Sequence, residues 1–135
     1  DEMAPELFIL SLSRHWEWGV NDFITAVVEY RNEIEMHLSN QGIGAAFHVV
    51  VEAETNSGRS LSVFPAEFEC ISPGKPHRVL LQWDTEEQEI AGTIRIKYCG
   101  PLGAKYSREY GFETTPETKL IPYPDRKRVE YPEDI

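Results

Sequence analysis

Short runs of alternating apolar and polar residues, separated by turn residues, constrain the fold of this chain more than any other feature. Residues 33–39 (Glu-Ile-Glu-Met-His-Leu-Ser) alternate strictly, so an extended backbone places Ile34, Met36 and Leu38 on one face. Residues 93–98 repeat the pattern with three apolar residues on the inward side. A period of two is typical of half-buried β-strands and excludes an amphipathic helix in these runs.

Further β-like runs occupy most of the first 113 residues. In residues 6–13, Phe8, Leu10 and Leu12 are expected on the inward face. The other runs are 45–55, 60–71, 78–83 and 105–112. Turn signals about every ten residues predict an all-β antiparallel sandwich of about seven or eight strands, with a closed barrel as the alternative. Pro65 favours the sandwich, because a proline inside a run indicates an edge strand or a crossing between sheets.

Residues 20–31 are ambiguous between helix and strand. Asn21 or Asp22 is suited to cap a helix, but the run Ile-Thr-Ala-Val-Val that follows is rich in β-branched residues. We therefore predict an extended conformation for this segment.

Length and charge narrow the class of protein. The chain has 135 residues and a formal net charge of −10, and its size suits a single domain. An acidic chain without a basic stripe is a poor ligand for phosphate backbones, so no nucleic-acid partner is expected. No run approaches the roughly 18 apolar residues of a membrane span, so direct membrane insertion of this segment is not expected either.

The pattern divides the chain into two parts. Residues 1–113 are predicted to form the β-sandwich domain, and residues 114–135 form a Pro-rich polar tail or linker without periodicity. The chain begins at Asp1 and shows no targeting segment, which favours a piece of a larger protein.

Three segments of the predicted sandwich carry a family resemblance. They are 40–46 (Asn-Gln-Gly-Ile-Gly-Ala-Ala), 72–74 (Ser-Pro-Gly) and 94–98 (Ile-Arg-Ile-Lys-Tyr), and Asn40 is suited to a left-handed turn. Together they resemble the immunoglobulin-like β-sandwich domains of bacterial and archaeal surface proteins, including the CARDB group. They are also similar to uncharacterised immunoglobulin-like domains that follow membrane-anchoring helices in prokaryotic proteins.

The resemblance covers roughly residues 6–113 and implies an immunoglobulin-like fold. It also implies a domain of a larger membrane-attached or surface protein, and it brings no catalytic residues with it. The partner is then another protein or the remainder of the same chain.

The two cysteines are predicted to be free thiols. Strand parity places Cys70 inward with Phe68, whereas Cys99 falls on the face opposite Tyr98. Side chains on opposite faces cannot form a disulfide.

A weak metal site can be drawn from the polar strand faces. His37, His48 and Glu52 are the candidate ligands, and further carboxylates lie at Glu33, Glu35 and Glu54. A polar outer face of a sheet is usually solvated charge, so we expect no metal and no cofactor.

Catalytic patterns are absent from the sequence. There is no Gly-x-Ser-x-Gly elbow, and the acidic cluster within 84–89 has no histidine beside it. The chain is therefore predicted not to be an enzyme. A hydrolase with an unrecognised site would need a deep polar pocket.

Trp16 and Trp18 are the most suggestive candidates for binding. In an extended segment they share one face, where they either cap the open end of the core or bind a ligand. Trp83 is predicted to be core. The favoured function is a non-catalytic interaction or spacer module, and the alternative is a carbohydrate-binding module that uses Trp16 and Trp18.

Overall fold

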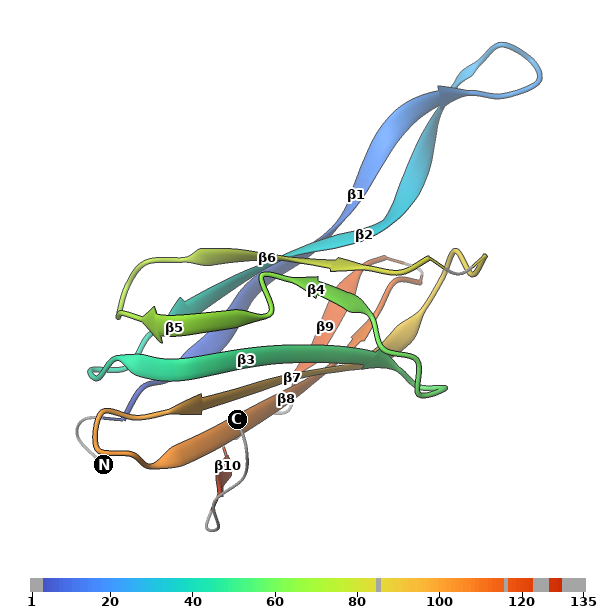
Figure 1. Ribbon diagram of the computed structural model, residues 1–135. Coiled ribbons are helices and arrows are strands. Elements are labelled where there is room, and N and C mark those ends of the chain that lie inside the picture. Colours follow the sequence, from blue (N-terminus) through green and yellow to red (C-terminus); the bar gives the residue numbers. More distant parts are fainter. Residues whose placement is uncertain (1–3, 85, 116, 123–126, 130–135) are drawn as a thin grey trace.

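The alternating runs pair into two antiparallel sheets in the computed structural model, which describes residues 4–84, 86–115, 117–122 and 127–129. Figure 1 shows the two sheets stacked as layers. The first sheet has the order β1 (Leu7–Val20), β2 (Ala26–Asn40), β6 (His77–Gln82) and β4 (Ser62–Phe64). The second has the order β10 (Lys127–Val129), β8 (Lys105–Glu113), β7 (Ala91–Cys99), β3 (Ala46–Thr55) and β5 (Glu67–Ile71), with β9 (Lys119–Pro122) also paired to β8.

This architecture confirms the predicted all-β sandwich, because the two sheets stay separate and do not close into a barrel. The described residues form ten strands, where seven or eight were expected. Residues 60–71 contribute two strands, β4 and β5, on either side of Pro65. They belong to different sheets, so the predicted crossing at this proline is confirmed. The segment beyond residue 113 adds β9 and β10. No helix long and apolar enough to cross a membrane occurs in the described part of the chain.

The core lies between the sheets and contains the predicted alternating residues. Ile34, Met36 and Leu38 of β2 are completely buried. They face a second completely buried set on β7, namely Ile94, Ile96 and Tyr98. Burial of large apolar side chains from both sheets is the main source of stability in such a sandwich.

A bulge in β1 makes the predicted inward face of residues 6–13 wrong for Phe8 and Leu10, whereas Leu12 packs against the core as predicted. The pairing of β1 with β2 shifts register between Ile9 and Ser11. Leu7 and Ile9 are therefore buried before the bulge, whereas Leu10 lies exposed within it. An extra residue in one strand reverses the parity of every residue that follows, which alternation in the sequence does not reveal.

The two thiols are free, as predicted, but for a different reason. Phe47 of β3 is the register partner of Cys70 on β5 and also of Cys99 on β7. Two strand spacings of about 4.8 Å hold the cysteines roughly 10 Å apart, beyond disulfide reach. The predicted inward placement of Cys70 is wrong: Cys70 is exposed, and Ile71, which pairs with buried Ala46, faces the core instead.

Asn40 joins three parts of the fold through one buried side chain. Its Oδ1 accepts hydrogen bonds from the N–H groups of Glu6 (3.1 Å) and Gly42 (3.0 Å). Its Nδ2 donates to the carbonyl oxygens of Gly44 and Ile71, both at 2.9 Å. The left-handed turn expected at Asn40 is not seen, because positive φ among non-glycine described residues occurs only at Ile24 and His48.

Removal of this side chain should destabilise the fold strongly. We expect Asn40→Ala to lower the free energy of unfolding by about 2–4 kcal/mol, because buried backbone groups lose their partners. Urea denaturation followed by tryptophan fluorescence measures the loss. Asn56→Ala, at an exposed turn position, is the matched control and should change stability by less than about 0.5 kcal/mol. Equal losses in the two variants would contradict this account of Asn40.

Candidate functional site

β1 and β2 continue beyond the sandwich as a two-stranded arm, which projects from one end of the body in Figure 1. Strand β6 pairs only with residues 33–38 of β2, so the earlier part of β2 pairs with β1 alone among the described strands. We define the arm as residues 16–30, with a turn at its tip. The predicted extended conformation of residues 20–31 is confirmed for both strand segments, and the helix alternative is wrong.

Asn21 shapes the tip of the arm. Its side-chain oxygen accepts hydrogen bonds from the N–H groups of Phe23 and Thr25, both at 3.0 Å. Ile24 takes a positive φ of 57° in this turn. Asparagine caps turns and helices with the same side-chain geometry, which explains why the sequence at this point also suits a helix start.

The arm has one apolar face and one acidic face. Residues directly opposite each other in an antiparallel pair project to the same side. The apolar face consists of the cross-strand pairs Trp16↔Tyr30, Trp18↔Val28 and Val20↔Ala26. The reverse face carries Glu17 opposite Glu29 and Gly19 opposite Val27. The side chain of Glu29 occupies the space where a Cβ at Gly19 would lie, so this face is flat and charged.

The apolar face of the arm is open to solvent. Seven of the twelve exposed large hydrophobic residues in the described chain belong to the arm. They are Trp16, Trp18, Val20, Phe23, Ile24, Val28 and Tyr30. A fully exposed aromatic side chain presents about 200 Å², so the four aromatic residues of the arm alone expose roughly 500 Å². Exposed apolar patches larger than a few hundred Å² are typical of interaction sites.

The two tryptophans predicted as a site lie on this face. Their ring centroids are 5.2 Å apart and their planes meet at 88°. Trp16 is 49% exposed and Trp18 67% exposed, so neither caps the core. The pair is therefore a feature of the surface and not of the core. The sequence did not indicate that Val28 and Tyr30 extend the same surface, or that Phe23 lies exposed at the tip of the arm.

Arg14 fastens the base of the arm to the body. Its guanidinium is buried and donates to the carbonyl oxygens of Arg31 and Gln88, to the Asn32 side chain at 3.4 Å and to Glu89 Oε1 at 3.1 Å. These partners come from β2 and from the loop between β6 and β7. A buried guanidinium is stable only when its donors are satisfied, so the arm and this loop are held together at Arg14.

Aromatic rings and a carboxylate complete this junction. The Arg14 guanidinium carbon lies 5.3 Å from the ring centroid of Tyr30 and 5.2 Å from that of Trp83, within cation–π range. Trp83, which was predicted to be core, is partly buried and packs against the core without belonging to it. Hydrogen bonds from Thr114 and Thr115, together with the charge of Arg14, lower the pKa of Glu89 against the opposing effect of burial.

His15 forms the centre of a charged network on the outer face of the first sheet. Its Nδ1 lies 2.6 Å from Glu33 Oε2, and its Nε2 lies 3.1 Å from Glu35 Oε1. The hydrogen bond to Glu33 is the main reason why the pKa of His15 is raised, and the same bond lowers the pKa of Glu33. Glu35 also binds Arg78 at 2.9 Å and faces His37 Nε2 at 3.3 Å. Imidazole, guanidinium and amide groups therefore already pair with the carboxylates of this face.

The candidate metal ligands are not brought together. His37 lies on β2 of the first sheet, whereas His48 and Glu52 lie on β3 of the second. The single polar face expected from the sequence is thus two faces on different sheets. Among the described residues, no group of three or more His, Cys, Asp or Glu side chains is placed to hold a metal ion.

A chain of contacts that resembles a catalytic triad joins Ser11, His37 and Glu35. Ser11 Oγ is 2.8 Å from His37 Nδ1, and the other ring nitrogen faces Glu35. The row lies on the open outer face of the sheet, and Ser11 is exposed. Acyl transfer also needs donors aimed at the developing oxyanion and a place for the substrate, and these three residues supply neither.

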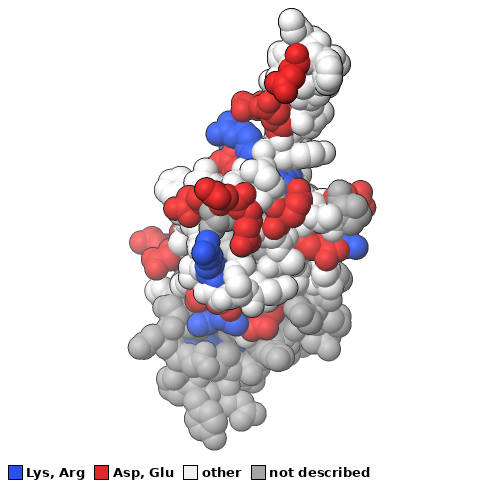
Figure 2. All heavy atoms as spheres, turned by 90° about the vertical axis from the view of Figure 1, so that its right-hand side faces the viewer, with Lys and Arg blue, Asp and Glu red and all other residues white. Residues whose placement is uncertain are grey.

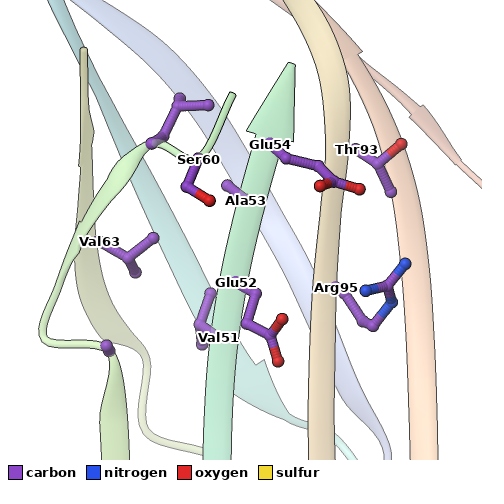
Figure 3. A pocket seen from close by; sticks show the side chains of 10 residues that line it. Val51, Glu52, Ala53, Glu54, Ser60, Val63, Thr93 and Arg95 are labelled. Atoms are coloured by element: carbon purple, nitrogen blue, oxygen red, sulfur yellow. The ribbon is translucent and has the colours of Figure 1, made fainter. Parts of the chain in front are cut away.

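A shallow pocket of about 240 Å³ lies where the segment between β3 and β5 crosses the edge of β3 (Figure 3). Glu52 and Glu54 line it beside Arg95, which donates to Glu109 at 2.8 Å. Its described lining includes Ser60 but no histidine base. This pocket is not the deep polar site that a hydrolase would need.

Comparisons with protein-family models, with curated proteins and with solved structures find no match to this chain. The arm is therefore a candidate site on the evidence of its own geometry alone.

Loss of the Arg14 side chain should loosen the arm and weaken the fold. We expect Arg14→Ala to lower the free energy of unfolding by about 2–4 kcal/mol, since it leaves buried acceptors unpaired. Amide hydrogen exchange in residues 16–30 should accelerate as well. Arg78→Ala removes an exposed ion pair and should cost less than about 1 kcal/mol. Similar losses in both variants, measured by urea denaturation, would overturn the anchoring role of Arg14.

The His15 network should give stability a defined pH dependence. A raised His15 pKa stabilises the fold fully below about pH 6.5, and this contribution is lost as pH rises through the folded-state pKa. The lowered Glu33 pKa stabilises above about pH 4.5, and that contribution is lost as pH falls through its folded-state pKa. The gap in unfolding free energy between the wild type and His15→Gln should be about 0.5–1 kcal/mol near pH 5–6.

Urea denaturation across this pH range measures the gap, which should shrink above about pH 8. His77→Gln, which removes a ring packed against Phe68, serves as the control for loss of an imidazole. A gap for His15→Gln that widens toward alkaline pH would contradict an ion pair at this position.

Proposed function

We propose that this chain is a non-catalytic, immunoglobulin-like module of a larger prokaryotic protein and that it binds a protein partner through the arm. The observation that carries the proposal is the solvent-exposed apolar face built on Trp16, Trp18 and Tyr30. A soluble chain rarely exposes so large an apolar surface unless another macromolecule covers it. The sandwich acts as the rigid support from which the arm projects.

The strand order supports the immunoglobulin-like part of the proposal. In constant-type immunoglobulin domains one sheet has the order A-B-E-D and the other contains C, F and G. Here the first sheet runs β1-β2-β6-β4, and the second places β3, β7 and β8 side by side. Equating β1, β2, β3 and β4 with A, B, C and D and β6, β7 and β8 with E, F and G reproduces the A-B-E-D order and the neighbours C, F and G, to which β5, β9 and β10 are additions.

The chemistry of the arm favours a protein over a membrane or a nucleic acid. Residues 16–30 contain no Lys or Arg and carry Glu17, Asp22 and Glu29. Anionic lipid surfaces and phosphate backbones both attract basic residues. Figure 2 shows further acidic side chains over the body below the arm, and the exposed loop there contains Asp84, Glu86, Glu87 and Glu89.

The geometry of the two tryptophans also bears on the carbohydrate alternative. Neighbouring sugar rings of a chain stack best on ring faces that lie side by side in one plane. Trp16 and Trp18 meet edge to face at 88°, so they do not form such a platform. Their packing suits insertion into a protein groove, where both edges and faces make contacts.

Site-specific photocrosslinking tests the proposed contact. A photoreactive phenylalanine analogue at position 18 should give light-dependent protein adducts in the cells that produce the parent protein. The same analogue at position 17, on the reverse face of the arm, is the matched control and should give few. Equal adduct yields at the two positions would contradict binding through the apolar face.

Indole fluorescence and a glycan array test the carbohydrate alternative. We expect no fluorescence shift on addition of polysaccharides and no array signal above that of Trp16→Ala. A saturable shift that is lost in Trp16→Ala and Trp18→Ala would replace the protein partner with a sugar.

A further inference from the structure

The two faces of the arm differ in charge and therefore in the kind of partner surface that can pack on them. The apolar face has no charged residue in any of its three cross-strand pairs, whereas the reverse face places Glu17 opposite Glu29. A partner that covers the apolar face therefore meets no buried charge that needs a counter-ion. It must supply a matching apolar surface of the same elongated shape.

We infer that the partner is a second copy of this chain, with the two arms packed apolar face to apolar face about a two-fold axis. The inference rests on the proposed function and names the occupant of the same site. In a two-fold pair the same patch is used on both subunits, so each arm provides the apolar ribbon that the other requires. The acidic reverse faces then point away from each other into solvent.

The exposed area agrees with this assembly when the tip is covered as well. The apolar side chains of each arm expose roughly 800 Å², of which Phe23 and Ile24 at the tip supply about 300 Å². That is about the contribution of one subunit to a standard protein interface. An isolated two-stranded ribbon is only marginally stable in water, so a facing ribbon would also complete the packing that the arm lacks.

Antiparallel placement of the arms brings each tip toward the base of the other. Phe23 and Ile24, both 87% exposed, then reach the aromatic surface around Tyr30 of the second copy. The same placement brings Asp22 near the acidic loop that follows β6. Because each chain also carries a formal charge of −10, added salt should strengthen the dimer by screening repulsion.

Sedimentation equilibrium of the 135-residue chain tests the inference. We expect a monomer–dimer equilibrium within about 1–100 μM protein. Trp18→Ser should weaken the dimer roughly thirtyfold, as expected for a central aromatic anchor. Glu17→Gln, on the reverse face of the same strand, is the matched control and should change the dissociation constant less than about threefold.

Further variants keep the test independent of folding. Circular dichroism and thermal melting check that Trp18→Ser retains the native fold. If it does not, Phe23→Ser at the exposed tip replaces it and should weaken the dimer in the same direction. The dimer fraction of the wild type should rise with added salt.

Three results would overturn the inference. The first is a wild type that stays monomeric throughout the tested range of protein concentration. The second is an equal effect of Trp18→Ser and Glu17→Gln on the dissociation constant. The third is a dimer that weakens with added salt, because that would require opposite charges across the interface. A monomeric wild type whose position 18 crosslinks to a different protein would remove the dimer and leave the proposed function standing. A monomer without crosslinks at position 18 would remove both.

Discussion

The continuous backbone ladder between β1 and β2 is the interaction on which the rest of the structure depends. Its inner part forms the edge of the first sheet, and its outer part is the whole arm. The inner part is held by the core and by pairing with β6, so its register is fixed by burial. The outer part inherits that register, and this inheritance places Trp16, Trp18 and Tyr30 on a single face.

Two buried polar side chains fix the orientation of this ladder relative to the sandwich. Asn40 fixes the end of β2 that lies within the sandwich, and Arg14 fixes the point where the arm leaves it. Both satisfy backbone groups that would otherwise be buried without partners. The arm therefore projects at a defined angle from a rigid base, which an interaction site needs if its contacts are not to be offset by ordering entropy.

Pro65 predicted the crossing between the sheets, because proline lacks the donor for a central ladder. Alternation in the sequence predicted the sandwich and the buried faces of β2 and β7, because both depend on local periodicity. It failed where one residue changes the parity, as at Leu10. It placed the two tryptophans on one face but did not reveal the arm, since nothing local shows that β6 ends before β2 does. The partners of Arg14 lie up to 75 residues away in the chain, so its role was invisible.

The acidity of the chain gains a structural meaning from the arm. After one face of an exposed two-stranded ribbon is covered, its reverse face and its two strand edges remain free. Such surfaces promote open-ended association of further copies. On this arm the further face carries Glu17 and Glu29, so a third copy would have to bury carboxylates against an apolar surface. A two-fold pair uses each apolar face once and leaves the faces that carry Glu17 and Glu29 in solvent. The charge pattern thus permits a closed dimer and opposes growth by face-to-face stacking of further arms.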